Sequence, residues 1–248
     1  MPAYRKSAQV DMTHGSVLGR AALFALPICA GNILQLLYST VDTLVMTLAS
    51  TLFAYLIGVP LGVLLVITAK DGLKPQRALN TVLGWIVNIG RSIPFIILLV
   101  AIIPFTRLVV GTSLGVPGAI VPLTVAAIPF VGRMVEQSLA EVDGGLVEAA
   151  QSFGANTWQI VCKVMLRESL PSLVRGASIT VITLFGYTAM AGAVGAGGIG
   201  DIAIRYGYQR YLGDVMIASI VLCIVLVQVF QSIGDLVARL VDKRVRRS

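Results

Sequence analysis

The sequence has few charged residues: 12% of its 248 residues are Asp, Glu, Lys or Arg, half of the ~25% that is typical of soluble domains. A chain this poor in charge lacks the residues that normally cover a globular surface, which excludes an ordinary soluble domain. The hydrophobic residues, 56% of the chain, are gathered in long uncharged runs. The composition therefore indicates a protein whose surface faces lipid.

Cysteine and histidine are also scarce, and those present form no chemical motif. Cys29, Cys162 and Cys223 lack the spacing of a disulfide framework or a metal site, and the single histidine, His14, stands alone in a polar stretch. The sequence has no HExxH motif, no paired carboxylates and no GxxxxGK[ST] phosphate-binding loop. We therefore expect a protein that is not an enzyme and holds no catalytic, cofactor-binding or metal site.

The formal net charge of +7 raises the question of nucleic-acid binding. We expect none, because the basic residues lie between the apolar runs and at the C-terminal tail rather than on one soluble face.

Several apolar runs are long enough to cross a membrane, for which a helix needs roughly 20 residues. After a first run over Gly19–Tyr38 and a short connection at Asp42, the predicted spans are Leu44–Ala69, Ala78–Phe105 with Arg91 inside it, Ala119–Gly132, Gly176–Gly200 and Val215–Gly234. Gly111–Gly118 is expected to be a loop. The chain is thus predicted to be an all-α integral membrane protein with a five-span core and an additional N-terminal helix.

The basic residues predict the orientation, because cytoplasmic loops are enriched in Lys and Arg. One set of loops holds Lys70, Lys74, Arg77, Arg133, Lys163, Arg167 and Arg175, and the basic tail follows the last span. The other loops hold Arg107, and Arg205 and Arg210 balanced by Asp201 and Asp214. We expect the first set to be cytoplasmic, with the N-terminus on the same side if the first run also spans.

The longest polar stretch between two spans is Glu148–Pro171, which we call the polar island. Leu146–Phe153 is rich in good helix formers and predicts a short helix after an Asp143–Gly145 loop. Gly154 is expected to end this helix, as glycine commonly does just past a C-terminus. Asn156 then predicts the cap of a second helix, with Gln159 completing a capping box.

On this second helix Trp158, Val161 or Cys162, and Met165 fall on one face at helical spacing. With Trp158 and Met165 facing outward, a bent helical pair is suited to the groove of another protein. The alternative is a helix that lies flat among lipid headgroups. The pattern alone leaves both interpretations open.

The polar island resembles the EAA loop of ABC-importer permeases, because Glu148, Ala149 and Ala150 are followed after three residues by Gly154. The resemblance implies that the loop docks into a cleft of a cytoplasmic ATPase subunit, which binds the ATP. The implied coupling residues are Glu148, Ala149, Ala150, Gly154, Trp158, Val164 and Leu166. The chain departs from the family pattern at Arg167, where the pattern has proline.

Further stretches resemble the methionine-importer branch of these permeases: Asn88–Gly115, Ala119–Glu136 and Gly186–Gly200 (GYTAMAGAVGAGGIG). The similarity runs from about Thr43 to the C-terminus. It implies a type I ABC importer in the bacterial inner membrane, with two permease copies, ATPase subunits and a periplasmic or lipoprotein methionine-binding protein. L- and D-methionine are both left open as substrates.

The N-terminal part differs, because Gly15–Val45 resembles the start of a MATE-type multidrug exporter. We therefore divide the chain into a polar tail (1–16), an additional helix (17–40), a permease domain (41–236) and a basic cytoplasmic tail (237–248). An ordinary anchoring helix is the alternative for 17–40. The alternative function is a secondary transporter or a multidrug exporter fragment. Ion coupling, however, usually needs ionisable groups at mid-membrane, and the arguable one, Arg91, is expected near an interface.

Two interpretations also remain for the run of small residues at Ala189–Gly200. Small side chains let helices approach closely, which favours a packing role for the first half. Gly197–Gly200 is expected to form a loop that leaves the span.

Overall fold

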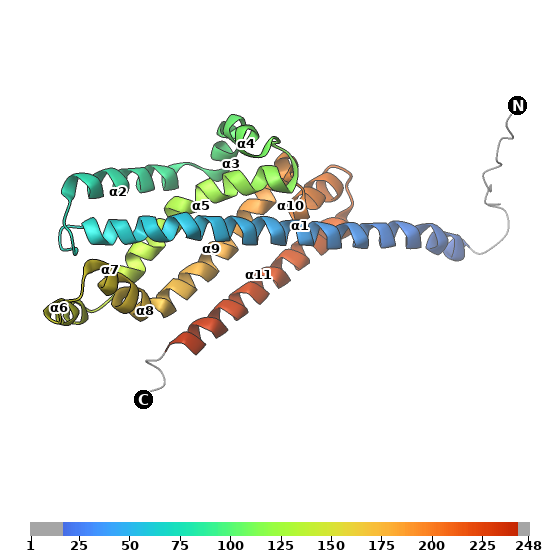
Figure 1. Ribbon diagram of the computed structural model, residues 1–248. Coiled ribbons are helices and arrows are strands. Elements are labelled where there is room, and N and C mark those ends of the chain that lie inside the picture. Colours follow the sequence, from blue (N-terminus) through green and yellow to red (C-terminus); the bar gives the residue numbers. More distant parts are fainter. Residues whose placement is uncertain (1–16, 243–248) are drawn as a thin grey trace, which may run out of the picture.

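The protein is a bundle of helices, seen in a computed structural model that describes the backbone of residues 17–242 and the side chains of residues 34–242 (Figure 1). Within this range its elements are α1 (Val17–Thr68), α2 (Arg77–Ser92), α3 (Phe95–Ala101), α4 (Ile103–Val110), α5 (Gly115–Ala140), α6 (Gly144–Ser152), α7 (Thr157–Gln159), the π-helix η1 (Ile160–Met165), α8 (Leu166–Glu168), α9 (Leu170–Ala191), the π-helix η2 (Gly192–Ala196), α10 (Gly198–Ile202), the π-helix η3 (Ala203–Tyr208) and α11 (Gly213–Val241).

Four helical stretches in the described part of the chain are long and apolar enough to cross a membrane: Leu34–Thr68, Gly115–Ala140, Leu170–Ala196 and Gly213–Val241. The pair α2 and α3 gives a fifth if it is counted as one span, bent by 100°. The bend falls at Ile93, which is extended (φ −81°, ψ 122°), as expected for a residue that precedes proline. The number of spans agrees with the predicted five-span core.

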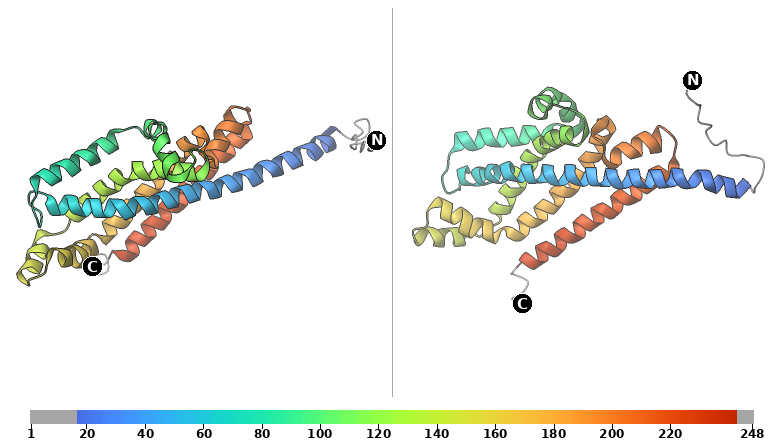
Figure 2. Two further views of the ribbon diagram at one scale, coloured as in Figure 1. Left: turned by 45° about the horizontal axis from the view of Figure 1, so that its top comes forward. Right: turned by 45° about the vertical axis from the view of Figure 1, so that its right-hand side comes forward.

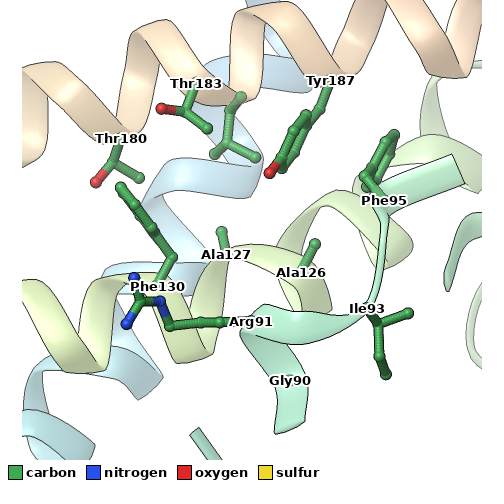
Figure 3. A pocket seen from close by; sticks show the side chains of 11 residues that line it. Gly90, Arg91, Ile93, Phe95, Ala126, Ala127, Phe130, Thr180, Thr183 and Tyr187 are labelled. Atoms are coloured by element: carbon green, nitrogen blue, oxygen red, sulfur yellow. The ribbon is translucent and has the colours of Figure 1, made fainter. Parts of the chain in front are cut away.

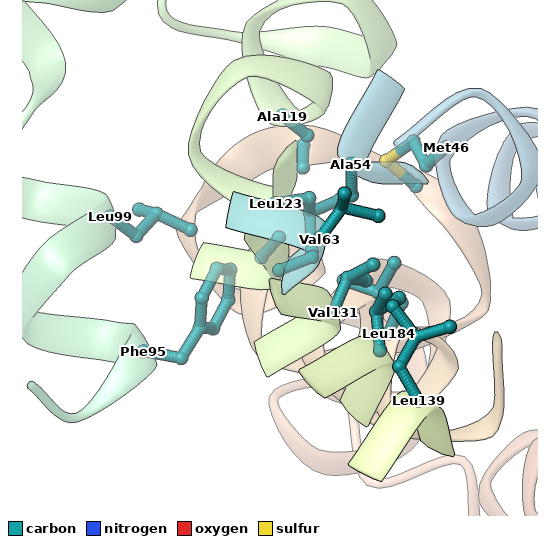
Figure 4. Packing of buried hydrophobic residues seen from close by; sticks show 14 of the residues in the cluster. Met46, Ala54, Val63, Phe95, Leu99, Ala119, Leu123, Val131, Leu139 and Leu184 are labelled. Carbon is teal, nitrogen blue, oxygen red and sulfur yellow. The ribbon is translucent and has the colours of Figure 1, made fainter. Parts of the chain in front are cut away.

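The core is built where α5 crosses α1 and α9, from buried residues of all three helices (Figure 4). The largest fully buried side chains include Met46 on α1, Leu123 on α5 and Leu184 on α9. Glycine permits the close approach of α1 to α5: a Cβ at Gly62 would lie 2.6 Å from the Gly132 carbonyl oxygen. Small residues at a helix crossing are typical of membrane bundles, since close backbone contact replaces the hydrophobic effect there.

The two ends of the bundle differ. The α1–α2 turn, α6–α8 and the C-terminal end of α11 gather at one end, while α4, α10 and the beginning of α1 lie toward the other (Figures 1 and 2). Lys70, Lys74, Lys163, Arg167 and Arg175 all lie in or beside the first group. The predicted cytoplasmic set of basic residues is therefore brought to one end of the molecule.

The predicted connection at Asp42 is wrong, because α1 runs without a break from Val17 to Thr68. Residues 33–57 contain no glycine or proline, and the hydroxyls of Thr40, Thr43 and Thr47 donate to carbonyl oxygens four residues earlier. These polar side chains are satisfied within the helix and do not interrupt it. The start of α1 consequently lies at the end opposite the polar island (Figures 1 and 2), and not on the same side as we predicted.

Three other boundaries also differ from the predictions. α5 begins at Gly115, so the second half of the expected 111–118 loop is helical. α11 continues to Val241, so the first residues of the predicted 237–248 tail are helical. α10 begins at Gly198, so the expected loop at Gly197–Gly200 is largely helix. The predicted tail at 1–16, residues 243–248, His14 and the Cys29 side chain lie outside the described residues.

Candidate functional site

The first helix of the site, α6, is amphipathic and capped. Asp143 is its N-cap: the carboxylate accepts a hydrogen bond of 2.7 Å from the Gly145 N–H. Gly144 and Gly145 therefore belong to the helix and not to the predicted loop. Val147 and Ala150 pack against the core, whereas Glu148 and Ala149 are exposed.

Gly154 ends α6 as predicted. Its φ of +79° is the left-handed backbone that glycine adopts without steric cost. The Gly154 N–H bonds the Gln151 carbonyl (2.9 Å), and the Ala155 N–H bonds the Ala150 carbonyl (3.1 Å). This pair of bonds is a Schellman motif, which satisfies the last carbonyls of the helix and turns the chain sharply toward the second helix.

The second helix begins with the predicted capping box. The Asn156 carboxamide oxygen accepts from the Gln159 N–H (2.9 Å), and the Gln159 side-chain oxygen accepts from the Asn156 N–H (3.0 Å). Helical backbone then continues through η1 and α8 to Glu168. Arg167, in place of the family's proline, lies within α8 and is exposed.

Met165 does not face outward as predicted. It is 5% exposed, and Ile160 and Val161 are also buried. The π-helical turn directs this side of the helix into the bundle, where Met165 lies with Val66 of α1 and Leu139 of α5 at the base of a recess. Trp158, seven residues earlier, does not line this recess. The prediction that Trp158 and Met165 share an outward face is therefore wrong. Of these two side chains, only Trp158 is exposed.

Two aromatic side chains project into solvent on either side of the Gly154 turn. Phe153 is 92% exposed and Trp158 is 71% exposed. Large apolar groups on the surface outside the lipid-facing spans are typical of interaction sites. The sequence interpretation missed Phe153, although an aromatic residue directly before a helix-ending glycine was a usable signal.

The recess itself has a volume of about 810 Å³ and lies between the α1–α2 turn and α6. Its rim carries Lys70, Asp71, Glu148 and Gln151. Among the predicted site residues, Glu148, Ala149, Gly154 and Trp158 are exposed, while Ala150, Val164 and Leu166 are half-buried. The structure thus brings the seven residues to one end of the bundle but divides them into an exposed edge and an anchoring side.

In the described part of the chain, no three His, Cys, Asp or Glu side chains are grouped in a way that could hold a metal ion. The exposed edge offers a carboxylate, two aromatic rings and small residues. A surface of this composition is suited to binding through shape and apolar contact.

A helical bundle with four apolar spans and a bent fifth defines a multi-pass membrane protein, and it carries an exposed, capped turn at one end. The sequence pattern of the family described as "binding-protein-dependent transport system inner membrane component" matches residues 58–247. The chain belongs to this family, and is therefore a membrane component of a transport system and not an enzyme.

Named relatives are similar over most of the chain. A Vibrio cholerae protein named "Probable D-methionine transport system permease protein MetI" is 54% identical over 209 residues, which cover 84% of this chain and 93% of that protein. The methionine import system permease protein MetP of Bacillus subtilis is 46% identical, over 73% of this chain and 82% of that protein. An inward-facing structure of the MetNI methionine ABC transporter matches with a TM-score of 0.84 and 51% identity, covering 85% of this chain and 98% of the matched chain.

Proposed function

We propose that this chain is the permease subunit of an ATP-driven importer of methionine in the bacterial inner membrane. The support is the naming of relatives that are 46–54% identical over most of the chain as methionine permeases. Transport of the L-isomer is proposed, with the D-isomer as a second substrate because the Vibrio cholerae relative is named for it.

The proposed assembly contains a second copy of this permease, ATPase subunits that bind the ATP, and a periplasmic or lipid-anchored methionine-binding protein. The feature that supports an ATPase partner is the exposed pair Phe153 and Trp158 on the basic end of the bundle. A cytoplasmic protein can reach that end if it faces the cytoplasm, as the excess of Lys and Arg favours.

The α6–α8 segment is joined by short connections to the spans α5 and α9, so a movement of the segment can be transmitted to them. Three residues join α5 to α6, and Ser169 alone separates α8 from α9. Ala150 and Leu166 pack against the core. In the proposed mechanism ATPase closure displaces this segment and thereby tilts α5 and α9 between two states of the pathway, as in a hinged domain closure.

For the domain organisation we propose a permease domain over 41–236, with 17–40 as an additional N-terminal helix continuous with its first span. The rival function, a secondary transporter or an exporter fragment, is not favoured, because the family match over 58–247 covers the spans that would form its pathway.

Removing the two exposed aromatics tests the docking surface. We expect Phe153→Ala combined with Trp158→Ala to weaken copurification of the ATPase subunit at least tenfold, because buried aromatic anchors commonly contribute 2 kcal/mol or more to an interface. The permease should keep its melting temperature, since neither side chain packs in the chain itself.

The matched control is Trp85→Ala on α2, which is also exposed, at 69%, but lies outside the polar island. It should copurify like the wild type. Equal ATPase recovery from the double variant and the wild type would refute the docking role of the Gly154 turn.

A further inference from the structure

A cavity of about 150 Å³ lies between α2, α5 and α9, away from the polar island (Figure 3). Its walls are Ala126, Ala127 and Phe130 from α5 and Thr180, Thr183 and Tyr187 from α9, and it is closed by Gly90, Arg91, Ile93, Phe95 and Leu184.

The cavity lies near the middle of two of the spans, α5 and α9. Ala126 and Ala127 are at the middle of α5 (Gly115–Ala140), and Thr180 is at the middle of α9 (Leu170–Ala191). α2 reaches the same depth, because a Cβ on Gly90 would lie 2.6 Å from Pro129 of α5. Arg91 follows Gly90 directly and therefore lies at the same level of the bundle, where its side chain is exposed at the surface of the single chain.

Arg91 makes no ion pair with any carboxylate that the structure describes; the three ion pairs found there involve Arg133, Arg175 and Arg205. A cation at membrane depth is costly, and is normally kept where it faces a water-filled cavity or binds a counter-charge. Arg91 lines the cavity (Figure 3). Its guanidinium is suited to a carboxylate, which it can bind through two parallel hydrogen bonds.

The opposite wall, from α9, offers oxygen acceptors (Figure 3). Thr180 and Thr183 each donate their hydroxyl proton to a carbonyl four residues earlier, at 2.8 Å. The Thr183 oxygen therefore remains available to accept a bond from a ligand, whereas the Thr180 oxygen lies 3.5 Å from the Tyr55 hydroxyl. Tyr187 is held against the Phe95 ring, stacked at 4.6 Å between ring centroids, which positions its hydroxyl at the same wall.

A cation on one wall, acceptor oxygens on the other and alanine, leucine and phenylalanine side chains between them match a small apolar zwitterion. The volume is suitable for one side chain, since a cavity of about 150 Å³ holds a molecule the size of benzene. We propose that this cavity is a binding site within the permease for an apolar amino acid, with Arg91 binding the α-carboxylate and Thr183 and Tyr187 receiving the ammonium group. The inference rests on the proposed function, of which it specifies a substrate site.

The test is methionine uptake into proteoliposomes that contain the complete transporter, with ATP hydrolysis measured in the same preparation. Arg91→Gln should lower Vmax/KM for uptake about tenfold or more, the loss expected for a charge-assisted hydrogen bond. ATP hydrolysis should stay within twofold of the wild type. Arg91→Lys should recover part of the uptake, because it keeps the charge but not the paired geometry.

Arg77→Gln is the matched control, because it removes a cation from the other end of the same helix. Thr183→Val is a second variant for use if Arg91→Gln does not assemble; it should raise KM severalfold without changing ATP hydrolysis. Uptake by Arg91→Gln or Thr183→Val that equals the wild type would overturn the site, as would an equal loss in Arg77→Gln.

The proposed function and the proposed binding site would be refuted by different results. If the wild-type transporter imported another apolar amino acid but not methionine, the proposed substrate would be wrong, and the same variants would still test the carboxylate site with that amino acid. If wild-type methionine uptake were unaffected by Arg91→Gln, the function would stand and the site would not.

Discussion

Gly154 and Gly111 share the same left-handed backbone conformation but lie at different ends of the bundle. Their φ angles are +79° and +80°, and a Cβ on either would meet nothing within 4 Å. Adding a side chain at either position therefore costs only the energy of holding a residue with a Cβ in the left-handed region, roughly 1–2 kcal/mol. Gly154 turns the chain between α6 and α7, whereas Gly111 ends α4 at the other end of the bundle.

Gly154→Val should accordingly uncouple ATP hydrolysis from uptake, because a shifted turn moves Phe153 and Trp158 relative to each other. We expect uptake in proteoliposomes to fall at least fivefold while ATP hydrolysis continues. Gly111→Val, with matched strain, should transport normally. Unchanged uptake by Gly154→Val at normal expression would contradict the coupling role of this turn.

Among the elements, the run of small residues after α9 folds back on itself. Gly195, Gly197 and Gly198 all have positive φ, and the chain reverses there so that α10 packs on the end of α9. The crossing is close: a Cβ on Gly200 would lie 2.4 Å from the Ala189 carbonyl oxygen. The Ile199 N–H also donates to the Thr43 hydroxyl of α1, at 2.9 Å, which anchors this reversal to the first span.

Gly200→Ala should therefore destabilise the permease, by about 1–3 kcal/mol from overpacking against a backbone that cannot move aside. The expected result is a melting temperature several degrees lower in detergent. Gly186→Ala on α9 is the control, since its Cβ would meet nothing within 4 Å. Equal melting temperatures for the two variants would show that the crossing is looser than the structure indicates.

For the molecule as a whole, the first prediction concerns orientation. In a background without Cys29, Cys162 and Cys223, Ser152→Cys on α6 should react with a membrane-impermeant maleimide only from the cytoplasmic side. Thr112→Cys in the turn before α5 should react only from the opposite side. Both positions are exposed. Labelling of Ser152→Cys from the periplasm would refute the proposed ATPase contact.

The second whole-molecule prediction concerns the beginning of α1. A chain that starts near Thr40 should still support uptake with its ATPase, because the remaining part of α1 exceeds the roughly 20 residues that a span needs. It loses the bond from Gln35 Nε2 to the Tyr206 hydroxyl, at 2.9 Å, a contribution of about 1 kcal/mol. Loss of uptake at normal expression would make 17–40 part of the working permease.

The sequence by itself determined the features that depend on neighbours along the chain. The apolar runs predicted the membrane class, and the glycine and asparagine of the polar island predicted the turn at Gly154 and the cap at Asn156. These signals are readable because caps and turns are made by residues within about five positions of each other.

Only the tertiary structure decided the features that depend on distant segments. Met165 is buried because α1 and α5 provide its neighbours, and Arg91 faces a cavity because α5 and α9 meet α2 at that depth. α1 continues through Asp42 because its polar residues find partners in the helix and on α10. Which side of a helix is covered is set by packing between helices far apart in sequence, and periodicity along one helix does not contain that information.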